Sequence, residues 1–184
     1  MLRRLPLYLC LLLLTQCSKC KNDPTPVDPA AQLPPATQTG ANTFGCLVNG
    51  QPYTPSGNNG TPNYAVLYDP GFQGGTLDVR TYRYPVKESG DKQSVLFGGV
   101  KVDRVGSYPL GAASGAGASF LDEFKAAPCG EFRSIRAGIY AKGVITVTRL
   151  DLQAGIIAGT FDFVLAQPGC DTVKVTQGRF DKKI

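Results

Sequence analysis

From Thr43 to the C-terminus, short apolar runs alternate with clusters of Gly, Pro and Asn, a pattern typical of antiparallel strands joined by turns. The 184-residue chain contains 22 Gly and 14 Pro, and Thr, Val, Tyr and Phe are frequent, which favours strands over helices. A chain of this length accommodates one domain with appendages. We therefore predict an all-β fold, a single antiparallel β-sandwich or partly open barrel of about 8–10 strands.

The last third of the chain gives the clearest strand pattern. Ile145 and Val147 share one face of a strand, whereas Leu150 falls on the opposite parity, so we expect a bulge near Arg149. Turn sequences at 153–155 and 167–169 then link three strands into an antiparallel meander. By contrast, the small-residue stretch 111–119 is predicted to be a flexible loop. The expected strands are 43–49, 63–69, 75–84, 93–102, 132–142, 143–152, 156–166 and 171–180.

The N-terminus has the organisation of a bacterial export signal. A positive segment containing Arg3 and Arg4 precedes an apolar stretch at 5–14, which is too short to cross a bilayer as a helix of roughly 20 residues. Leu14-Thr15-Gln16-Cys17 resembles a lipobox, where the signal peptide is cleaved before a lipidated cysteine. The residue before that cysteine is usually Gly, Ala or Ser, and here it is Gln16. We predict a signal peptide at 1–16 and lipidation of Cys17, in preference to Cys10 or Cys20.

Residues 17–42 contain five prolines and almost no large apolar residue, so we expect a disordered or extended linker before the β domain at 43–184. The sequence leaves open whether this linker is a stalk or tolerated disorder. Together with the signal peptide, it predicts a protein of the bacterial cell envelope, held on a membrane, most simply the outer membrane, by its lipid.

The first and last blocks of the β domain carry a family resemblance. TFGCLVNGQPYTP at 43–55, GVITVTRLDLQAGIIAGTFDF at 143–163 and VKVTQGRFDKK at 173–183 resemble an uncharacterised family of Bacteroidetes lipoproteins, a domain of unknown function. The resemblance implies lipidation, an envelope location and a β fold. It carries over no activity and no catalytic residue.

Composition excludes several classes of function. The chain has no histidine, which removes the Ser-His-Asp triad, the Cys-His pair and every histidine-liganded metal site. From Thr43 onward there are 15 basic and 12 acidic residues, and the basic ones are scattered rather than gathered in a stripe, so we do not expect nucleic acid as a partner. No cofactor is expected either.

Three cysteines lie within the β domain. Cys129 and Cys170 both stand in turn-like sequences, and an oxidising compartment permits their pairing, so we predict a Cys129–Cys170 disulfide. Cys46 alternates with Phe44 and Val48 and is expected to be a buried thiol. The wide spacing of the three thiols does not predict a metal site.

Two groups of polar residues deserve comparison with known chemistries. Paired carboxylates of the kind that glycosidases use would have to come from Asp122, Glu123, Asp151 and Asp162, which the pattern places more simply on the solvated surface. Arg80, Tyr82 and Tyr84 are expected on one strand face, where they form a candidate ligand surface able to stack on sugars or bases. Ordinary cross-strand packing of the tyrosines is the alternative.

These observations favour a non-catalytic envelope protein that binds a glycan, a peptide or another envelope protein, or that has a structural role. No catalytic residue is predicted. One alternative is a small carboxylate-dependent hydrolase, which requires a deep cleft lined by two acids. Another is a lipocalin-like carrier, which requires a closed barrel around an empty apolar lumen.

Overall fold

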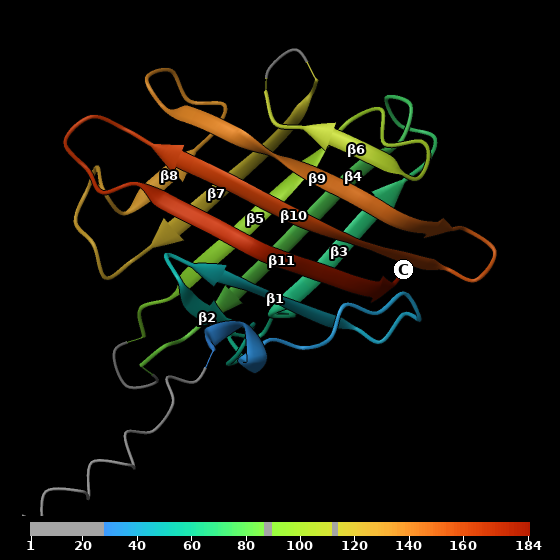
Figure 1. The fold of residues 1–184 in the computed structure, drawn as a ribbon, viewed down its shortest axis with the longest axis horizontal. Coiled ribbons are helices and arrows are strands. Elements are labelled where there is room, and N and C mark those ends of the chain that lie inside the picture. Colours follow the sequence, from blue (N-terminus) through green and yellow to red (C-terminus); the bar gives the residue numbers. More distant parts are fainter. Residues whose placement is uncertain (1–27, 87–89, 112–113) are drawn as a thin grey trace, which may run out of the picture.

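The computed structural model describes residues 28–86, 90–111 and 114–184. These residues form strands in two antiparallel sheets that lie face to face without closing into a barrel, so the fold is a β-sandwich (Figure 1). The six-stranded sheet has the order β2 (Gln51–Tyr53), β1 (Thr43–Val48), β11 (Val173–Lys183), β10 (Ile156–Ala166), β9 (Tyr140–Asp151) and β6 (Gly106–Pro109). The five-stranded sheet has the order β3 (Tyr64–Asp69), β4 (Thr76–Arg83), β5 (Gln93–Gly99), β7 (Ala116–Asp122) and β8 (Glu131–Arg133).

Aromatic side chains from both sheets fill the centre of the sandwich. The rings of Phe97 on β5 and Phe161 on β10 lie 4.3 Å apart, and Phe44 on β1 lies 5.2 Å from Phe161. All three are almost completely buried, because alternate residues of each strand face the opposite sheet. The lipocalin-like alternative required a closed barrel around an empty lumen, and the described residues form neither.

The C-terminal meander agrees with the sequence prediction. β9, β10 and β11 are antiparallel neighbours, and Thr148 is the extra residue where the register shifts between Arg149 and Val147, so the expected bulge lies one residue from Arg149. A second register shift occurs in β11, where Gln177 has a φ of 52°. A bulge at each place keeps the large apolar residues on the inner face.

Two predictions in the middle of the chain were wrong. The strand expected at 132–142 is two strands, since β8 ends at Arg133 and β9 begins at Tyr140 after a turn in which Gly138 has a φ of 83°. The stretch 111–119, expected to be a loop, contributes Ala116 and the residues after it to β7, between β5 and β8. β5 and β7 approach so closely there that a Cβ added to Gly99 of β5 would lie only 3.0 Å from the Cα of Ala116. Only small residues fit at this contact. β2 and β6 were also not predicted.

The prediction of a disordered or extended linker over 17–42 was wrong for residues 28–42. This described part of the linker lies against the domain, and we call it the N-terminal strap. It begins with a short 3-10 helix, η2 (Pro29–Gln32), followed by the buried side chain of Leu33. Pro34 then packs so closely on β1 that a Cβ on Gly45 would lie 2.7 Å from its Cδ.

A buried carboxylate holds the end of the strap. Asp181 of β11, 1% exposed, accepts hydrogen bonds from the hydroxyl of Thr37 at 2.7 Å and from the backbone N–H groups of Thr39, Gly40 and Ala41 at 2.8 to 3.1 Å. Burial alone would raise the pKa of Asp181, but these hydrogen bonds outweigh burial and lower it. This polar segment therefore docks on the domain largely through its backbone N–H groups. Such docking cannot be predicted from the pattern of apolar and polar side chains.

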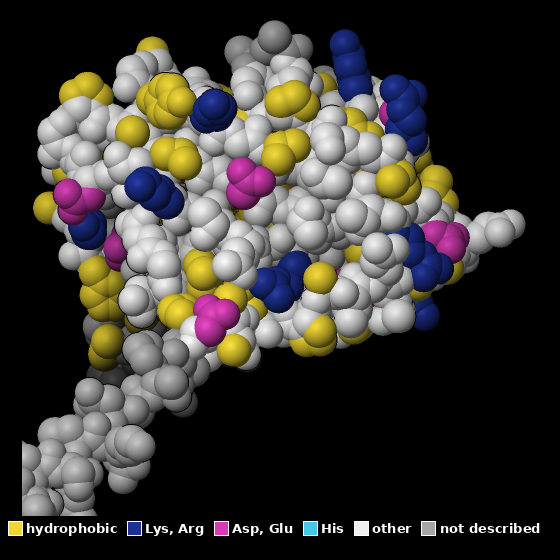
Figure 2. All heavy atoms as spheres, in the orientation of Figure 1, with side chains coloured by type: hydrophobic (Ala, Val, Ile, Leu, Met, Phe, Trp, Pro, Cys, Tyr) yellow, Lys and Arg dark blue, Asp and Glu magenta, His cyan; other side chains and the backbone are white. Residues whose placement is uncertain are grey.

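Charges on the outer surface are mixed in sign. On the face shown in Figure 2, Lys and Arg side chains are interspersed with Asp and Glu side chains. Several form partly exposed ion pairs between near neighbours, for example Arg149 with Asp151 and Arg133 with Glu131. Such pairs contribute little to stability.

Candidate functional site

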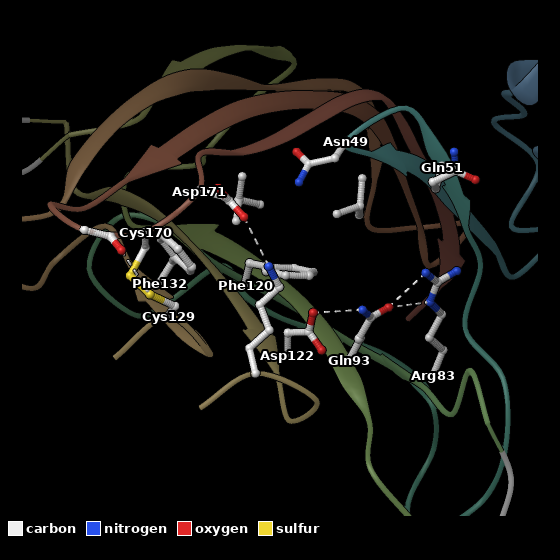
Figure 3. A pocket seen from close by; sticks show the side chains of 14 residues that line it. Asn49, Gln51, Arg83, Gln93, Phe120, Asp122, Cys129, Phe132, Cys170 and Asp171 are labelled. Atoms are coloured by element: carbon white, nitrogen blue, oxygen red, sulfur yellow. Dashed lines mark hydrogen bonds and ion pairs between the residues drawn. A yellow bond between two sulfur atoms is a disulfide. The ribbon is translucent and has the colours of Figure 1, made fainter. Parts of the chain in front are cut away.

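A cavity of about 380 Å³ lies at one end of the sandwich, between the two sheets (Figure 3). We call it the end cavity. Its walls come from the β1–β2 turn, the end of β4, the start of β5, β7 with its following loop, β8, and the β10–β11 turn. Its size is near the lower end of the range of about 300–1,000 Å³ typical of small-ligand sites.

The inner face of the five-stranded sheet ends in polar residues where β4, β5 and β7 border the cavity. Arg83 of β4 lies opposite Gln93 of β5, and Gln93 lies opposite Asp122 of β7. Residues two positions inward on these strands are Thr81, Val95 and Phe120, all buried. We call Arg83, Gln93 and Asp122 the polar row. These three residues lie on the same face of the sheet as the core residues, and their side chains line the cavity (Figure 3).

Gln93 connects the two charges of the polar row. Its carbonyl oxygen accepts hydrogen bonds from Nε and Nη2 of Arg83 at 3.0 and 2.9 Å, and its amide nitrogen donates to Asp122 at 3.1 Å. The two interactions fix the orientation of the amide, because only its oxygen accepts and only its nitrogen donates. A cation and an anion are thus held in one wall without direct contact.

Neighbouring groups hold each end of the polar row. Arg83 donates from Nη1 to the carbonyl oxygen of Pro52 and lies 4.7 Å from the ring centre of Tyr53. Burial lowers the pKa of Arg83, and Tyr53, Cys46 and Asp122 partly offset this effect. Asp122, 7% exposed, accepts a further hydrogen bond from the backbone N–H of Phe124 at 3.2 Å.

The mouth of the cavity carries more polar groups. Asn49 and Gly50 have φ values of 49° and 80°, as a two-residue type I′ hairpin turn requires. The side-chain oxygen of Asn49 accepts a hydrogen bond from the N–H of Lys174 at 2.7 Å, and Figure 3 shows this side chain at the mouth. Across from it, Lys125 pairs with the exposed carboxylate of Asp171 at 3.4 Å.

Apolar groups and a disulfide complete the lining. Phe120, Phe132 and two valines form the apolar part of the wall. Cys129 and Cys170 are joined, with Cα atoms 5.4 Å apart, in agreement with the predicted pairing. The disulfide links the β7–β8 loop to the β10–β11 turn and so connects the two sheets beside the cavity.

The third cysteine of the domain lies away from this lining. Cys46 is fully buried, as predicted, and burial raises the pKa of its thiol to about 12. A neutral thiol in this position acts as a small apolar side chain of the core.

The surface predicted around Arg80, Tyr82 and Tyr84 is only partly assembled. Arg80 and Tyr82 line a separate hollow of about 480 Å³ on the outer face of the five-stranded sheet, and Tyr84 does not. Tyr82 is 8% exposed, and its hydroxyl lies within hydrogen-bonding distance of two acceptors, the carbonyl oxygen of Thr61 and the side-chain oxygen of Asn59. Arg80 pairs with Asp78. The Tyr82 ring edge is therefore occupied by the chain itself.

The four carboxylates considered for a hydrolase do not converge on one site. Only Asp122 lines the end cavity. Glu123 pairs with Lys92 at 3.6 Å, Asp151 accepts hydrogen bonds from Arg149 and Ala154, and Asp162 is exposed in the middle of β10. The second acid of the end cavity is Asp171, which was not among the four.

Sequence reasoning missed most of the end cavity. The Asn49-Gly50 dipeptide is a hairpin signal that was available. Arg83 and Gln93 carry no such signal, because only the registers of β4 with β5 and of β5 with β7 bring them together with Asp122. Within residues 28–86, 90–111 and 114–184, no group of three or more Cys, Asp or Glu is placed to hold a metal ion, and no helix is long and apolar enough to span a membrane.

Comparison of the chain with models of known families, with curated proteins and with solved structures finds no match. Cys17 lies outside the described residues.

Proposed function

We propose that this chain is a lipid-anchored protein of the bacterial envelope that binds a neutral glycan, without catalysis, in the end cavity. The export signal, Cys17 and the resemblance to Bacteroidetes lipoproteins support the anchor. The polar row beside an apolar wall carries the proposal for the ligand. A sugar presents hydroxyl groups that both donate and accept, together with apolar ring faces, and so needs a lining of this mixed kind.

Charge balance in the cavity favours an uncharged ligand. Arg83 and Lys125 supply two cations, and Asp122 and Asp171 supply two anions. Each cation already faces a polar partner, so an additional ionic group on a ligand would displace an existing interaction. Hydroxyl groups can join the same network without displacing a charge. The cavity volume suits a monosaccharide unit, free or at the end of a longer chain.

The anchor and the strap set how far the domain stands from the membrane. The strap is docked from residue 28 onward, so ten residues, 18–27, separate it from Cys17. An extended chain spans at most about 3.6 Å per residue, so the eleven steps from Cys17 to residue 28 span no more than about 40 Å. The proposal therefore keeps the start of the strap within this distance of the lipid anchor.

Asp122→Asn is expected to weaken sugar binding by roughly tenfold or more, because the amide replaces a charged acceptor that contributes about 1.5–3 kcal/mol per hydrogen bond. Isothermal titration calorimetry with glucose, galactose, mannose and N-acetylglucosamine measures this on the full chain in a detergent without a sugar headgroup. Asp162→Asn, which changes an exposed acid of β10, is the matched control. Equal affinities for the two variants, with both folded, would refute the assignment of the cavity.

Cys17→Ser is expected to abolish incorporation of radiolabelled palmitate and to release the protein from the membrane fraction. Cys20→Ser is the matched control, since it changes a neighbouring thiol and should leave labelling intact. Labelling that persists in Cys17→Ser and disappears in Cys20→Ser would move the anchor to Cys20. Labelling in neither parent nor variants would disprove lipidation.

A further inference from the structure

The two sheets have four edge strands, and three of them are protected against pairing with another chain. β2 has three residues including Pro52, β6 has four and ends at Pro109, and β8 has three, of which Glu131 and Arg133 form an ion pair. Short length, proline and charge are the usual devices that keep an edge from recruiting a further strand. β3 has none of them over its first five residues, which are Tyr-Ala-Val-Leu-Tyr, and its register with β4 is regular.

The hydrogen-bonding groups of β3 divide between β4 and the outer edge. The N–H of Tyr82 on β4 donates to the carbonyl oxygen of Asn63 at 3.0 Å, and antiparallel pairing alternates from there, so Ala65 and Leu67 also bond to β4. The N–H and C=O groups of Tyr64, Val66 and Tyr68 therefore point outward. Among the described residues, Lys182 is the one partner found for them, donating to the carbonyl oxygen of Tyr64 at 3.3 Å.

The side chains along this edge leave an apolar surface in solvent. Leu67 is 61% exposed, although its neighbours Val66 and Tyr64 are buried in the core. Figure 1 shows β3 as the outermost strand of its sheet. Apart from Lys182 at Tyr64 and Asp69 at its end, the edge is regular and carries no charge, and with its exposed leucine it has the features of an edge that accepts another strand.

We propose that a second copy of this chain occupies the β3 edge, with the two β3 strands antiparallel about a twofold axis at Val66. In this register Val66 faces its own counterpart, Tyr64 faces Tyr68, and Leu67 faces Ala65 of the second copy, so each exposed leucine gains an apolar cross-strand neighbour. Asp69 faces Asn63, and no like charges meet. The two five-stranded sheets form one continuous sheet across the dimer.

Prolines on both sides of β3 select this register. Pro62 and Pro70 flank the strand and have no N–H to donate. A twofold axis moved to Tyr64 would set Val66 opposite Pro62, and one moved to Tyr68 would set it opposite Pro70. Either shift loses two hydrogen bonds, because the contact occurs once for each copy. The shift toward Tyr68 also sets Leu67 opposite Asp69. The strand is thus most complementary to itself in a single alignment.

Leu67→Lys is expected to convert a dimer of the full chain in detergent into a monomer, because it places a lysine, a residue that protects edge strands from pairing, directly beside the twofold axis. Size-exclusion chromatography with light scattering measures the protein mass, near twice that of one chain for the parent and that of one chain for the variant. Leu152→Lys is the matched control, because Leu152 is 56% exposed in the β9–β10 turn and should remain dimeric. A monomeric parent, or a dimer that survives Leu67→Lys, would overturn the proposal.

A cross-linking experiment tests the register. In a Cys20→Ser background, an equal mixture of Ala65→Cys and Leu67→Cys chains is expected to form disulfide-linked dimers faster than either variant alone. The reason is that directly opposed Cβ atoms lie about 4.5–5.5 Å apart, whereas diagonal pairs lie farther. Equal rates for the mixture and the single variants would contradict the axis at Val66.

Discussion

Replacing Cys129 and Cys170 together with serine is expected to lower the free energy of unfolding by about 4 kcal/mol. The two cysteines are 41 residues apart in sequence, and the chain-entropy relation assigns about this value to a closed loop of that length. The effect is large for a single domain, whose total stability is usually about 5–15 kcal/mol. Urea unfolding followed by circular dichroism measures it.

Reductant provides the control for this experiment. The parent protein treated with reductant should match the untreated double variant, whereas reductant should leave the variant unchanged. Without reductant, alkylation of the unfolded parent should label Cys46, a free thiol, and spare Cys129 and Cys170. Parent and variant of equal stability, or alkylation of all three thiols, would contradict the disulfide.

Asp181→Ala is expected to lower the free energy of unfolding by about 3 kcal/mol, because hydrogen bonds to a charged group contribute roughly 1.5–3 kcal/mol each and water replaces part of the loss when the strap is released. Asp162→Ala changes an exposed acid on the neighbouring strand and should cost less than about 0.5 kcal/mol. Urea unfolding compares the two. Similar losses for both variants would show that the strap is not held by Asp181.

The same carboxylate predicts a pH dependence. Its folded pKa is lowered, so its contribution is fully present above the unfolded value of about 3.9 and is lost as pH falls through the folded pKa. The stability of the parent should therefore fall more steeply than that of Asp181→Asn below about pH 4. Thermal unfolding between pH 3 and pH 7 provides the comparison. Parallel curves would mean that Asp181 titrates alike in the folded and unfolded chains.

The parts of the fold that the sequence predicts well are those where large apolar residues alternate. The parity of Ile145, Val147 and Leu150 locates a bulge, and the alternation around Phe161 defines β10 with its observed ends. β7 was not predicted because Ala116-Gly117-Ala118 has no large side chain. Its burial depends on the close approach of Gly99 on β5. The sequence of a single segment gives no information about this contact between two strands.

In the candidate site, too, some features can be predicted from the sequence and others cannot. Cys129 and Cys170 can be paired from their turn sequences and the expected compartment. The polar row cannot, because Arg83, Gln93 and Asp122 are separated in sequence and meet only through the registers of β4 with β5 and of β5 with β7. A contact distant in sequence also changes the predicted surface at Tyr82, since the loop containing Asn59 folds back over the Tyr82 hydroxyl.

A neutral sugar is expected to bind in the end cavity. The most direct test is a titration of the isotope-labelled full chain with neutral monosaccharides at up to about 10 mM, followed by the NMR shifts of backbone amides. We expect shifts at Asn49, Gln93, Phe124 and Gly169, which surround the cavity or donate to Asp122. Shifts confined to the hollow around Arg80 and Tyr82, or no shifts with any of the sugars, would contradict the proposed function.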